Sequence, residues 1–253
     1  MTIRFLGTGT SQGVPVIACD CRVCTSVDPR DKRLRSSVLV TENGKNIVID
    51  TGPDFRYQML RENIKHLEAV LYTHAHKDHI AGLDDIRAFN YFQGVAIDVY
   101  ADQRVQDELK REFYYMFNEH KYPGIPRINL HDVNQETIYL HDIAIEPIEV
   151  MHHELPIKGY RFGDFTYLTD VKTVSPLAID KIKGTKILVI NALQREPHIS
   201  HFNLEEALAF AHTIGAEQTY LTHISHRLGR YQEVSQELPD GVYLAYDGLM
   251  LTL

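Results

Sequence analysis

Short apolar runs rich in β-branched and aromatic residues recur along the whole chain. Runs of this kind, separated by polar and glycine-containing segments, predict β-strands. The predicted strands are Ile3–Leu6, Ser37–Val40, Asn46–Asp50, Ala69–Thr73, Ile97–Tyr100, Ile143–Met151, Gly159–Phe162, Phe165–Thr169, Ile187–Ile190, Thr219–Thr222 and Val242–Tyr246.

Between these strands, apolar residues recur with the helical period, and Asp54, Asp102 and Asn203 are candidate N-caps. The predicted helices are Asp54–Ile64, His79–Asn90, Asp102–Phe117, Val174–Ile182, Asn203–Ile214 and Tyr231–Leu238. Because helices occur in both halves of a strand-rich chain, we expect an α/β fold with two packed sheets and helices outside them.

Composition adds limits on class and partners. The chain has 253 residues, 44% hydrophobic and 24% charged, so we expect one globular domain over residues 1–253. Its net charge is −8, and no Lys/Arg run follows a phosphate backbone, which disfavours a long nucleic acid as partner. No run approaches a membrane span and the N-terminus lacks signal-peptide features, so we expect a cytoplasmic protein without membrane contact.

Residues that can bind metal ions follow several predicted strands. The runs 166–170 and 219–223 are nearly the same pentapeptide, and they end in Asp170 and His223. The runs that end in His74 and His152 repeat the arrangement. Rigid strand ends fix ligand positions well, so the pattern predicts one site built from four strand ends.

The densest group is Thr73-His74-Ala75-His76-Lys77-Asp78-His79. His74 and His76 point to the same side of an extended segment and can therefore reach one cation. Asp78 and His79 fall at the start of the next predicted helix and can face a second cation. Imidazole and carboxylate together suit a dinuclear site with a bridging aspartate.

The order Thr-His-x-His-x-Asp-His, followed by strand-end His, Asp and His, resembles the metallo-β-lactamase superfamily. The segments 7–11 and 49–52 also fit this resemblance. It implies an αββα sandwich and an enzyme with two divalent catalytic metals, Zn or Mn. The metal ligands that the resemblance implies are His74, His76 and His152 for the first metal, Asp78, His79 and His223 for the second, and Asp170 as the bridge.

Two positions leave alternatives open. His152 and His153 both follow the strand Ile143–Met151, and we choose His152 because it ends that run as the ligand of the resembled superfamily does. Asp50 either orients a ligand imidazole or caps the turn at Thr51.

The three cysteines form the motif Cys19-x-Cys21-x-x-Cys24. Three thiolates at this spacing and one histidine suit a closed, structural zinc site, and His226 can supply the fourth ligand. The alternative is three reduced thiols without a special role. The pairing resembles the phosphodiesterases of bacterial phosphonate degradation that act on phosphoribosyl cyclic phosphate.

Those enzymes and the ribonuclease Z family place a catalytic histidine, which is not a metal ligand, at a helix start. This resemblance assigns His201 as the general acid for the leaving group, with His198 as the competing choice. Asp78 helps to orient the metal-bound hydroxide that attacks the phosphodiester. The chain lacks the arm and basic surface that ribonuclease Z uses for tRNA.

We therefore expect a hydrolase for a small phosphodiester, with cyclic phosphodiesters included in that class. The segment that includes Tyr114–Phe117 and Lys121–Pro123 departs from the phosphonate-pathway pattern, and it either lines the pocket or packs as a helix face. The alternative functions are a thioesterase or other carboxylic-ester hydrolase, and a non-catalytic metal-dependent scaffold. The resembled enzymes dimerise, and the sequence leaves a homodimer open.

Overall fold

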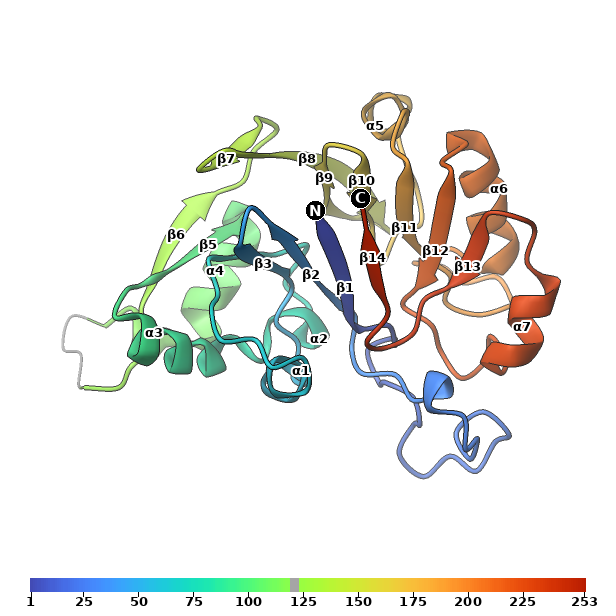
Figure 1. Ribbon diagram of the computed structural model, residues 1–253, viewed down its shortest axis with the longest axis horizontal. Helices are drawn as coiled ribbons and strands as arrows, with labels where there is room; N and C mark the ends of the chain where they lie inside the picture. The colour runs from blue at the N-terminus through green and yellow to red at the C-terminus, as the bar shows by residue number, and fades with distance from the viewer. Residues whose placement is uncertain (119–122) are drawn as a thin grey trace. The chain divides into compact units, whose positions relative to one another are not determined.

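The computed structural model describes residues 1–118 and 123–253, in which the chain forms two compact units (Figure 1). The first unit contains Met1–Leu6, Ser37–Asn134 and Met250–Leu253, and the second contains Gly7–Ser36 and Gln135–Leu249. Within the described residues, each unit is built on one seven-stranded mixed sheet with helices beside it. Lys121 and Tyr122, which the aromatic segment includes, lie outside the described residues. One domain over residues 1–253 stays a prediction.

The sheet of the first unit combines strands from both ends of the chain with strands from residues 37–132. In order across the sheet, its strands are β14 (Met250–Thr252), β1 (Thr2–Gly7), β2 (Ser37–Glu42), β3 (Lys45–Ile49), β4 (Ala69–Leu71), β5 (Ile97–Ala101) and β6 (Ile128–Asp132). Strands β3 to β6 run parallel, while β1 pairs antiparallel with β14 and β2 with β3. Parallel strands end at the same edge, so the segments after β3 and β4 come together there.

The helices of this unit bury one apolar face each against the sheet or against each other. They are α1 (Phe55–Arg61), α2 (Lys77–Ile80), α3 (Arg87–Gln93) and α4 (Gln103–Glu112). Asp102 caps α4 as predicted, because its carboxylate accepts a hydrogen bond from the Val105 N–H at 3.0 Å. Asp54 is not a cap: its backbone is already helical and its side chain makes no capping hydrogen bond.

The predicted helix His79–Asn90 is wrong as one element. Helix α2 begins at Lys77, a 3₁₀ helix covers Leu83–Ile86, and α3 follows. Gly82 separates the pieces, since its N–H donates to the Thr51 carbonyl at 2.8 Å instead of to its own helix. A Cβ at Gly82 would lie 2.2 Å from the carbonyl oxygen of Gly52, so this close approach requires glycine.

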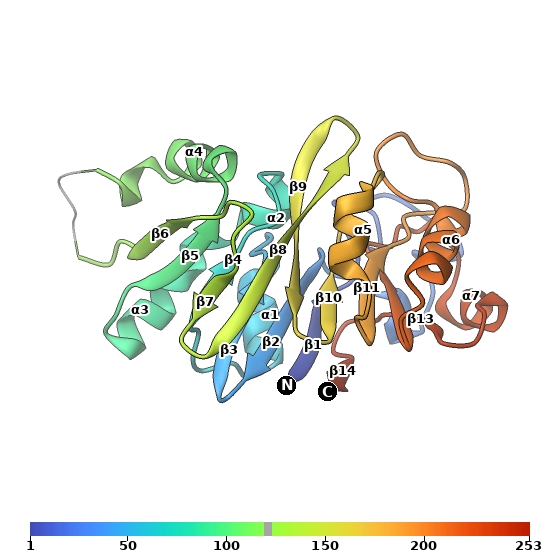
Figure 2. The ribbon, with the colours of Figure 1, turned by 90° about the horizontal axis from the view of Figure 1, so that it is seen from above.

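The second unit's sheet has a parallel half and an antiparallel half. Its strands in order are β13 (Val242–Leu244), β12 (Gln218–Thr222), β11 (Ile187–Asn191), β10 (Phe165–Tyr167), β9 (Leu155–Phe162), β8 (Ile143–His152) and β7 (Ile138–Leu140). Strands β10 to β13 are parallel, and β7 to β10 are antiparallel. The long β8–β9 hairpin is visible in Figure 2, and β9 begins four residues before the predicted Gly159.

Three α-helices pack on this second sheet: α5 (Pro176–Ile182) on β8, α6 (Leu204–Ile214) on β11 and α7 (Tyr231–Glu237) on β13. Asn203 caps α6 as predicted. Its side chain accepts from the Glu206 N–H at 2.9 Å, and the Glu206 carboxylate accepts from the Asn203 N–H at 2.9 Å. This reciprocal pair is a capping box, which fixes the start of α6 next to His201.

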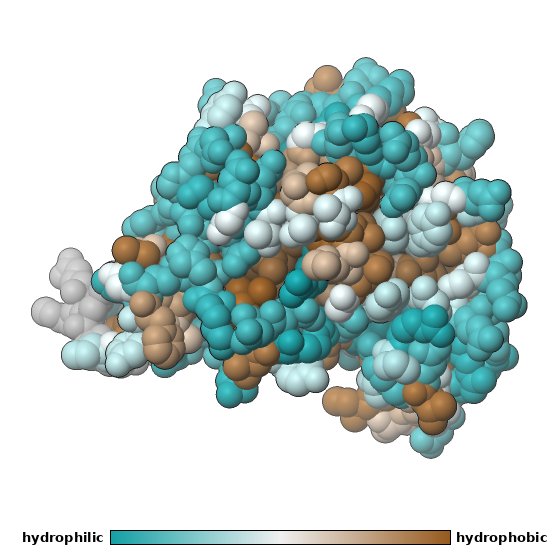
Figure 3. Space-filling model, in the orientation of Figure 1, coloured by the Kyte–Doolittle hydropathy of each residue, from teal (hydrophilic) through white to brown (hydrophobic). Residues whose placement is uncertain are grey.

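On the face drawn in Figure 3, hydrophobic residues form smaller areas among hydrophilic ones. No helix within residues 1–118 and 123–253 has the length and apolarity that crossing a membrane requires.

Candidate metal sites

The first unit carries the histidine-rich segment directly after β4. His74 is buried, and its Nε2 lies 3.0 Å from Nδ1 of His76. The two imidazoles therefore present nitrogen atoms at one point, as their spacing in an extended segment predicts. His76 ends the extended segment, because it is the residue that precedes the first turn of α2.

Asp78 and His79 lie in that first turn of α2. His79 is fully buried, and its Nε2 lies 3.2 Å from Oδ2 of Asp78. These two donor atoms also converge on one point, so the first unit alone offers four ligand-type side chains.

Asp50 holds His79 in place from the end of β3. Its Oδ2 accepts a hydrogen bond from Nδ1 of His79 at 2.7 Å, and both carboxylate oxygens also accept from Thr73. Burial raises the pKa of Asp50, and His79 opposes that shift. This contact supports the orienting role that the sequence left open for Asp50, because a carboxylate on one imidazole nitrogen directs the other toward a metal.

The second unit carries the remaining predicted ligands at its strand ends. Nδ1 of the buried His152 lies 2.8 Å from the Asp170 carbonyl oxygen and 2.9 Å from that of Ser200. Its protonated Nδ1 therefore donates to carbonyl groups, which leaves Nε2 for a metal. His153 is exposed with a φ of 55°, in the turn of the β8–β9 hairpin. The choice of His152 as ligand stays a prediction that this geometry favours.

Asp170 lies at the centre of the second unit's group. Its Oδ1 is 3.2 Å from Nε2 of His223 and 2.9 Å from Nε2 of His201. Its Oδ2 accepts a hydrogen bond from the Thr169 hydroxyl at 2.6 Å. Nitrogen or oxygen donor atoms of His152, Asp170 and His201 all lie within 4.8 Å of one another.

His201 is oriented by its own neighbours before α6 begins. Its Nδ1 lies 3.0 Å from the Ser200 hydroxyl and 3.2 Å from Nδ1 of His198. Its ring stacks on His223 with 5.1 Å between the ring centroids. These contacts direct the Nε2 atom of His201 at Asp170, whereas Nδ1 of His198 faces Ser200 and His201.

Three residues of the candidate site, Asp50, Asp170 and His223, have left-handed backbones. The φ angles are 64° at Asp50, 58° at Asp170 and 53° at His223. Such angles are uncommon outside glycine and cost about 1–3 kcal/mol each, and they cluster at functional sites. Their position at three candidate residues supports a functional use of these strand ends.

The cysteine motif forms a separate four-residue group inside the second unit. Nδ1 of His226 lies 3.3 Å from Sγ of Cys19 and 3.5 Å from Sγ of both Cys21 and Cys24. All four donor atoms lie within 4.8 Å of one another. Three sulfurs around one imidazole nitrogen match the donor set of a structural zinc site.

Backbone N–H groups point at two of the sulfurs. The Cys24 N–H donates to Sγ of Cys21, and this contact lowers the pKa of the Cys21 thiol to about 6. Burial raises the pKa of Cys24 to about 11, although the Val16 N–H donates to its sulfur. The thiolate is the form that binds a metal, so a bound cation would favour ionisation of both.

Sequence reasoning missed the threonines that precede the ligands. The Thr73 hydroxyl lies 2.8 Å from Oδ2 of Asp50 and 3.0 Å from Nδ1 of His74, and Thr169 bonds Asp170. The repeated Thr-ligand dipeptide at 73–74 and 169–170 is the signal that could have identified them. These hydroxyls fix ligand side chains that the strands alone leave free to rotate.

Two residues of the aromatic segment, Tyr115 and Met116, pack within the first unit. Met116 is buried, Tyr115 packs against the apolar cluster of the first unit, and its hydroxyl bonds Asp84. These contacts favour the helix-packing interpretation for both side chains.

Residues 45–224 match the family model described as the beta-lactamase superfamily domain. The chain therefore belongs to the metallo-β-lactamase superfamily of hydrolases, and its two mixed sheets with flanking helices have that fold. This confirms the predicted family and fold class. The fold implies that the protein binds divalent metal ions.

Within the superfamily, the chain is similar to a diphosphatase of the PhnP family. The identity is 43% and the TM-score 0.93, over 100% of this chain and 97% of that structure. It is also 42% identical over 252 residues to an octanoyltransferase of Porphyromonas gingivalis, which covers 98% of this chain and 51% of the relative. A ribonuclease Z of Nostoc sp. is 29% identical over 168 residues, 65% of this chain and 47% of the relative. The chain thus spans about half the length of the curated relatives it matches.

Proposed function

We propose that the protein is a dinuclear metal-dependent phosphodiesterase. Its substrate is a small phosphodiester, and cyclic phosphodiesters are included in that class. The observation that carries the proposal is the similarity along the whole chain to a PhnP-family diphosphatase, combined with the Cys19–Cys24 and His226 group. The 29% identical ribonuclease Z also supports chemistry at a phosphorus–oxygen bond.

The donor atoms within each unit fit divalent cations. In the first unit, His74 with His76 and Asp78 with His79 converge in pairs at 3.0 and 3.2 Å. In the second unit, His152, Asp170 and His223 offer imidazole and carboxylate donors held by carbonyl and hydroxyl groups. The proposal assigns these seven residues to two metals, Zn or Mn, with Asp170 as the shared ligand. When bound, such metals lower the pKa of a water molecule to about 7 and neutralise phosphate oxygens.

The chain's own residues supply proton transfer and orientation. His201 is held by Ser200 and directed at Asp170, so its Nε2 is in position to protonate a departing alkoxide. Asp78, beside His79 in the first turn of α2, orients the attacking water. Asp50 and Thr73 keep the imidazoles of His79 and His74 from rotating.

A substrate panel tests this function. Purified protein with added Mn²⁺ or Zn²⁺ is assayed on bis(p-nitrophenyl) phosphate, a ribose cyclic phosphate, a nucleoside diphosphate and an octanoyl thioester. We expect turnover of the two phosphodiesters, loss of this turnover in Asp170→Asn, and retention in His212→Ala, whose imidazole is exposed on α6. If the protein hydrolysed only the nucleoside diphosphate, its substrate class would be phosphoric anhydrides and not phosphodiesters.

A second candidate is an acyl-ester or thioester hydrolase on the same ligands. The observation that favours it is the 42% identical relative that is named octanoyltransferase, although this chain spans 51% of that relative. Turnover of the octanoyl thioester without turnover of any phosphate ester would establish it. Tight metal binding without turnover of any substrate would instead support the metal-dependent scaffold.

The remaining parts of the proposal concern zinc and partners. One structural zinc bound by Cys19, Cys21, Cys24 and His226 would bring the total to three metals per chain. The proposed partner is the small phosphodiester itself, and with a net charge of −8 we expect no binding to long RNA or DNA in a gel-shift assay. A homodimer is also proposed, and sedimentation velocity decides it.

A further inference from the structure

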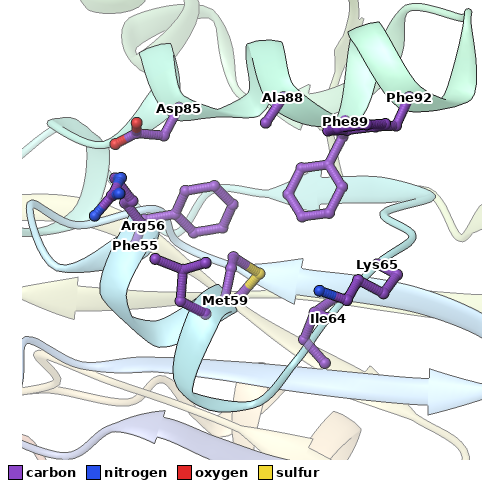
Figure 4. Close-up of a pocket in the computed structure, with 10 residues that line it drawn as sticks. Phe55, Arg56, Met59, Ile64, Lys65, Asp85, Ala88, Phe89 and Phe92 are labelled. Atoms are coloured by element: carbon purple, nitrogen blue, oxygen red, sulfur yellow. The ribbon is translucent and has the colours of Figure 1, made fainter.

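The first unit contains an apolar cavity of about 570 Å³ between α1 and α3 (Figure 4). This volume falls in the range of small-molecule sites, about 300–1,000 Å³. Neither the metal ligands nor His201 line it. The lining residues are Phe55, Arg56, Met59, Leu60, Ile64, Lys65, Asp85, Ala88, Phe89 and Phe92.

The floor of the cavity is buried and apolar. Phe55, Met59 and Phe89 are each less than a tenth exposed, and they belong to the main apolar cluster of the unit. The rings of Phe55 and Phe89 lie 6.4 Å apart at 54° and, in Figure 4, face the cavity from its two helical walls. Fixed aromatic and thioether surfaces of this kind favour an alkyl chain, because burying each CH₂ group contributes about 0.8 kcal/mol.

The charged groups lie at opposite ends. Asp85 and Arg56 face each other at one end in Figure 4, and Lys65 lies at the other end. Burial raises the pKa of Asp85, and the positive charge of Arg56 opposes that shift. Lys65 makes no hydrogen bond and no ion pair with any residue in the described part of the chain, so its ammonium group is available to a ligand.

We infer that this cavity binds a medium-chain aliphatic carboxylate, with the alkyl chain over Met59 and the two phenylalanines and the carboxylate on Lys65. The charges of the lining favour an anion, because the cations Arg56 and Lys65 lie there with only one carboxylate, that of Asp85. The volume of about 570 Å³ limits the length of the alkyl chain that the cavity can hold. The inference rests on the cavity alone and not on the proposed phosphodiesterase function.

Calorimetric titration of the metal-loaded protein with hexanoate, octanoate, decanoate and 1-decanol tests the site. We expect affinity to rise about fourfold for each added CH₂ group up to the length at which the chain meets the Arg56–Asp85 end. Lys65→Gln should weaken decanoate about fivefold and leave 1-decanol unchanged, since an exposed ion pair contributes modestly. Raising the salt concentration should weaken decanoate only.

Two further variants separate binding in this cavity from binding elsewhere on the protein. Ala88→Trp fills the cavity from an exposed position of α3 and should reduce binding of both ligands at least tenfold, with phosphodiesterase turnover unchanged. Lys110→Gln removes an exposed lysine of α4 outside the cavity and should change nothing.

Absence of decanoate binding to the wild type would overturn the inference. It would also be wrong if Lys65→Gln weakened both ligands equally. Another outcome is that decanoate does not bind and that the wild type forms a dimer, which Ala88→Glu dissociates. This outcome would show that a second copy of the chain covers the cavity. If decanoate binds while no phosphate ester is hydrolysed, the proposed function fails and this site stands.

Discussion

His201 is assigned proton donation to the leaving group and no metal bond, and the variant His201→Ala tests this assignment. In the structure its side chain is 12% exposed, and Nε2 lies 2.9 Å from Oδ1 of Asp170. Ser200 and His198 hold the other ring nitrogen. The substitution therefore removes one oriented proton donor and leaves the surrounding strands and α6 in place.

The expected loss depends on the substrate. General acid catalysis contributes about 10²–10⁴-fold, so kcat on an alkyl phosphodiester should fall by this factor, or about 3–5 kcal/mol in activation free energy. A p-nitrophenolate group leaves with little need of a proton, and kcat on bis(p-nitrophenyl) phosphate should fall by less than about tenfold. The ratio of the two losses measures the proton transfer itself.

The assay pairs steady-state kinetics on both substrates with metal content by mass spectrometry. The matched control is His212→Ala, an exposed histidine of α6, which should match the wild type on both substrates. Equal losses on the two substrates would refute the general-acid role. Loss of one metal in His201→Ala would make His201 a ligand, and the substrate-dependent pattern in His198→Ala alone would move the role to His198.

Four other outcomes are expected. Asp170→Ala should abolish turnover and lower metal content, and a rate near that of the wild type would show that the active site has been misplaced. Cys24→Ser should release one zinc and lower the melting temperature more than the activity of the folded fraction; equal zinc content in mutant and wild type, measured after mild chelation, would contradict the structural site. Asn203→Ala removes the α6 cap and should lower the free energy of unfolding by about 1 kcal/mol and the melting temperature by about 2–4 °C. A decrease of less than about 1 °C would contradict the importance of this cap. Gly82→Ala should cost about 1–3 kcal/mol in chemical unfolding because its Cβ meets the Gly52 backbone, and an unchanged midpoint would show that the loop yields easily.

Local patterns predicted the parts of the site that depend on neighbouring residues in sequence. The strand β4 follows from its apolar run, the shared side of His74 and His76 follows from a period of two, and the Asn203 cap follows from the residues around it. The cysteine spacing likewise implied a cluster that the structure brings to His226. Apart from the contact with His226, these features need no knowledge of distant contacts.

Other features depend on packing between distant segments and were not predicted. The break at Gly82 arises because the chain passes the Gly52 carbonyl, which a helical period cannot indicate. Strands β6, β7 and β14 have many partly exposed positions, so their apolar signal is weak. The contact of the Thr73 hydroxyl with Asp50 exists only after the ends of β3 and β4 are adjacent.

The cysteine group has a consequence for how the protein is made. Cys24 and His226 are 202 positions apart in the chain. At a synthesis rate of about 5–20 residues per second, the three thiols wait about 10–40 s on the ribosome before the histidine emerges. During that interval the three sulfurs are without the imidazole nitrogen that lies 3.3–3.5 Å from them in the folded protein. The four donor atoms of the cysteine group therefore come together only after almost the whole chain has been synthesised.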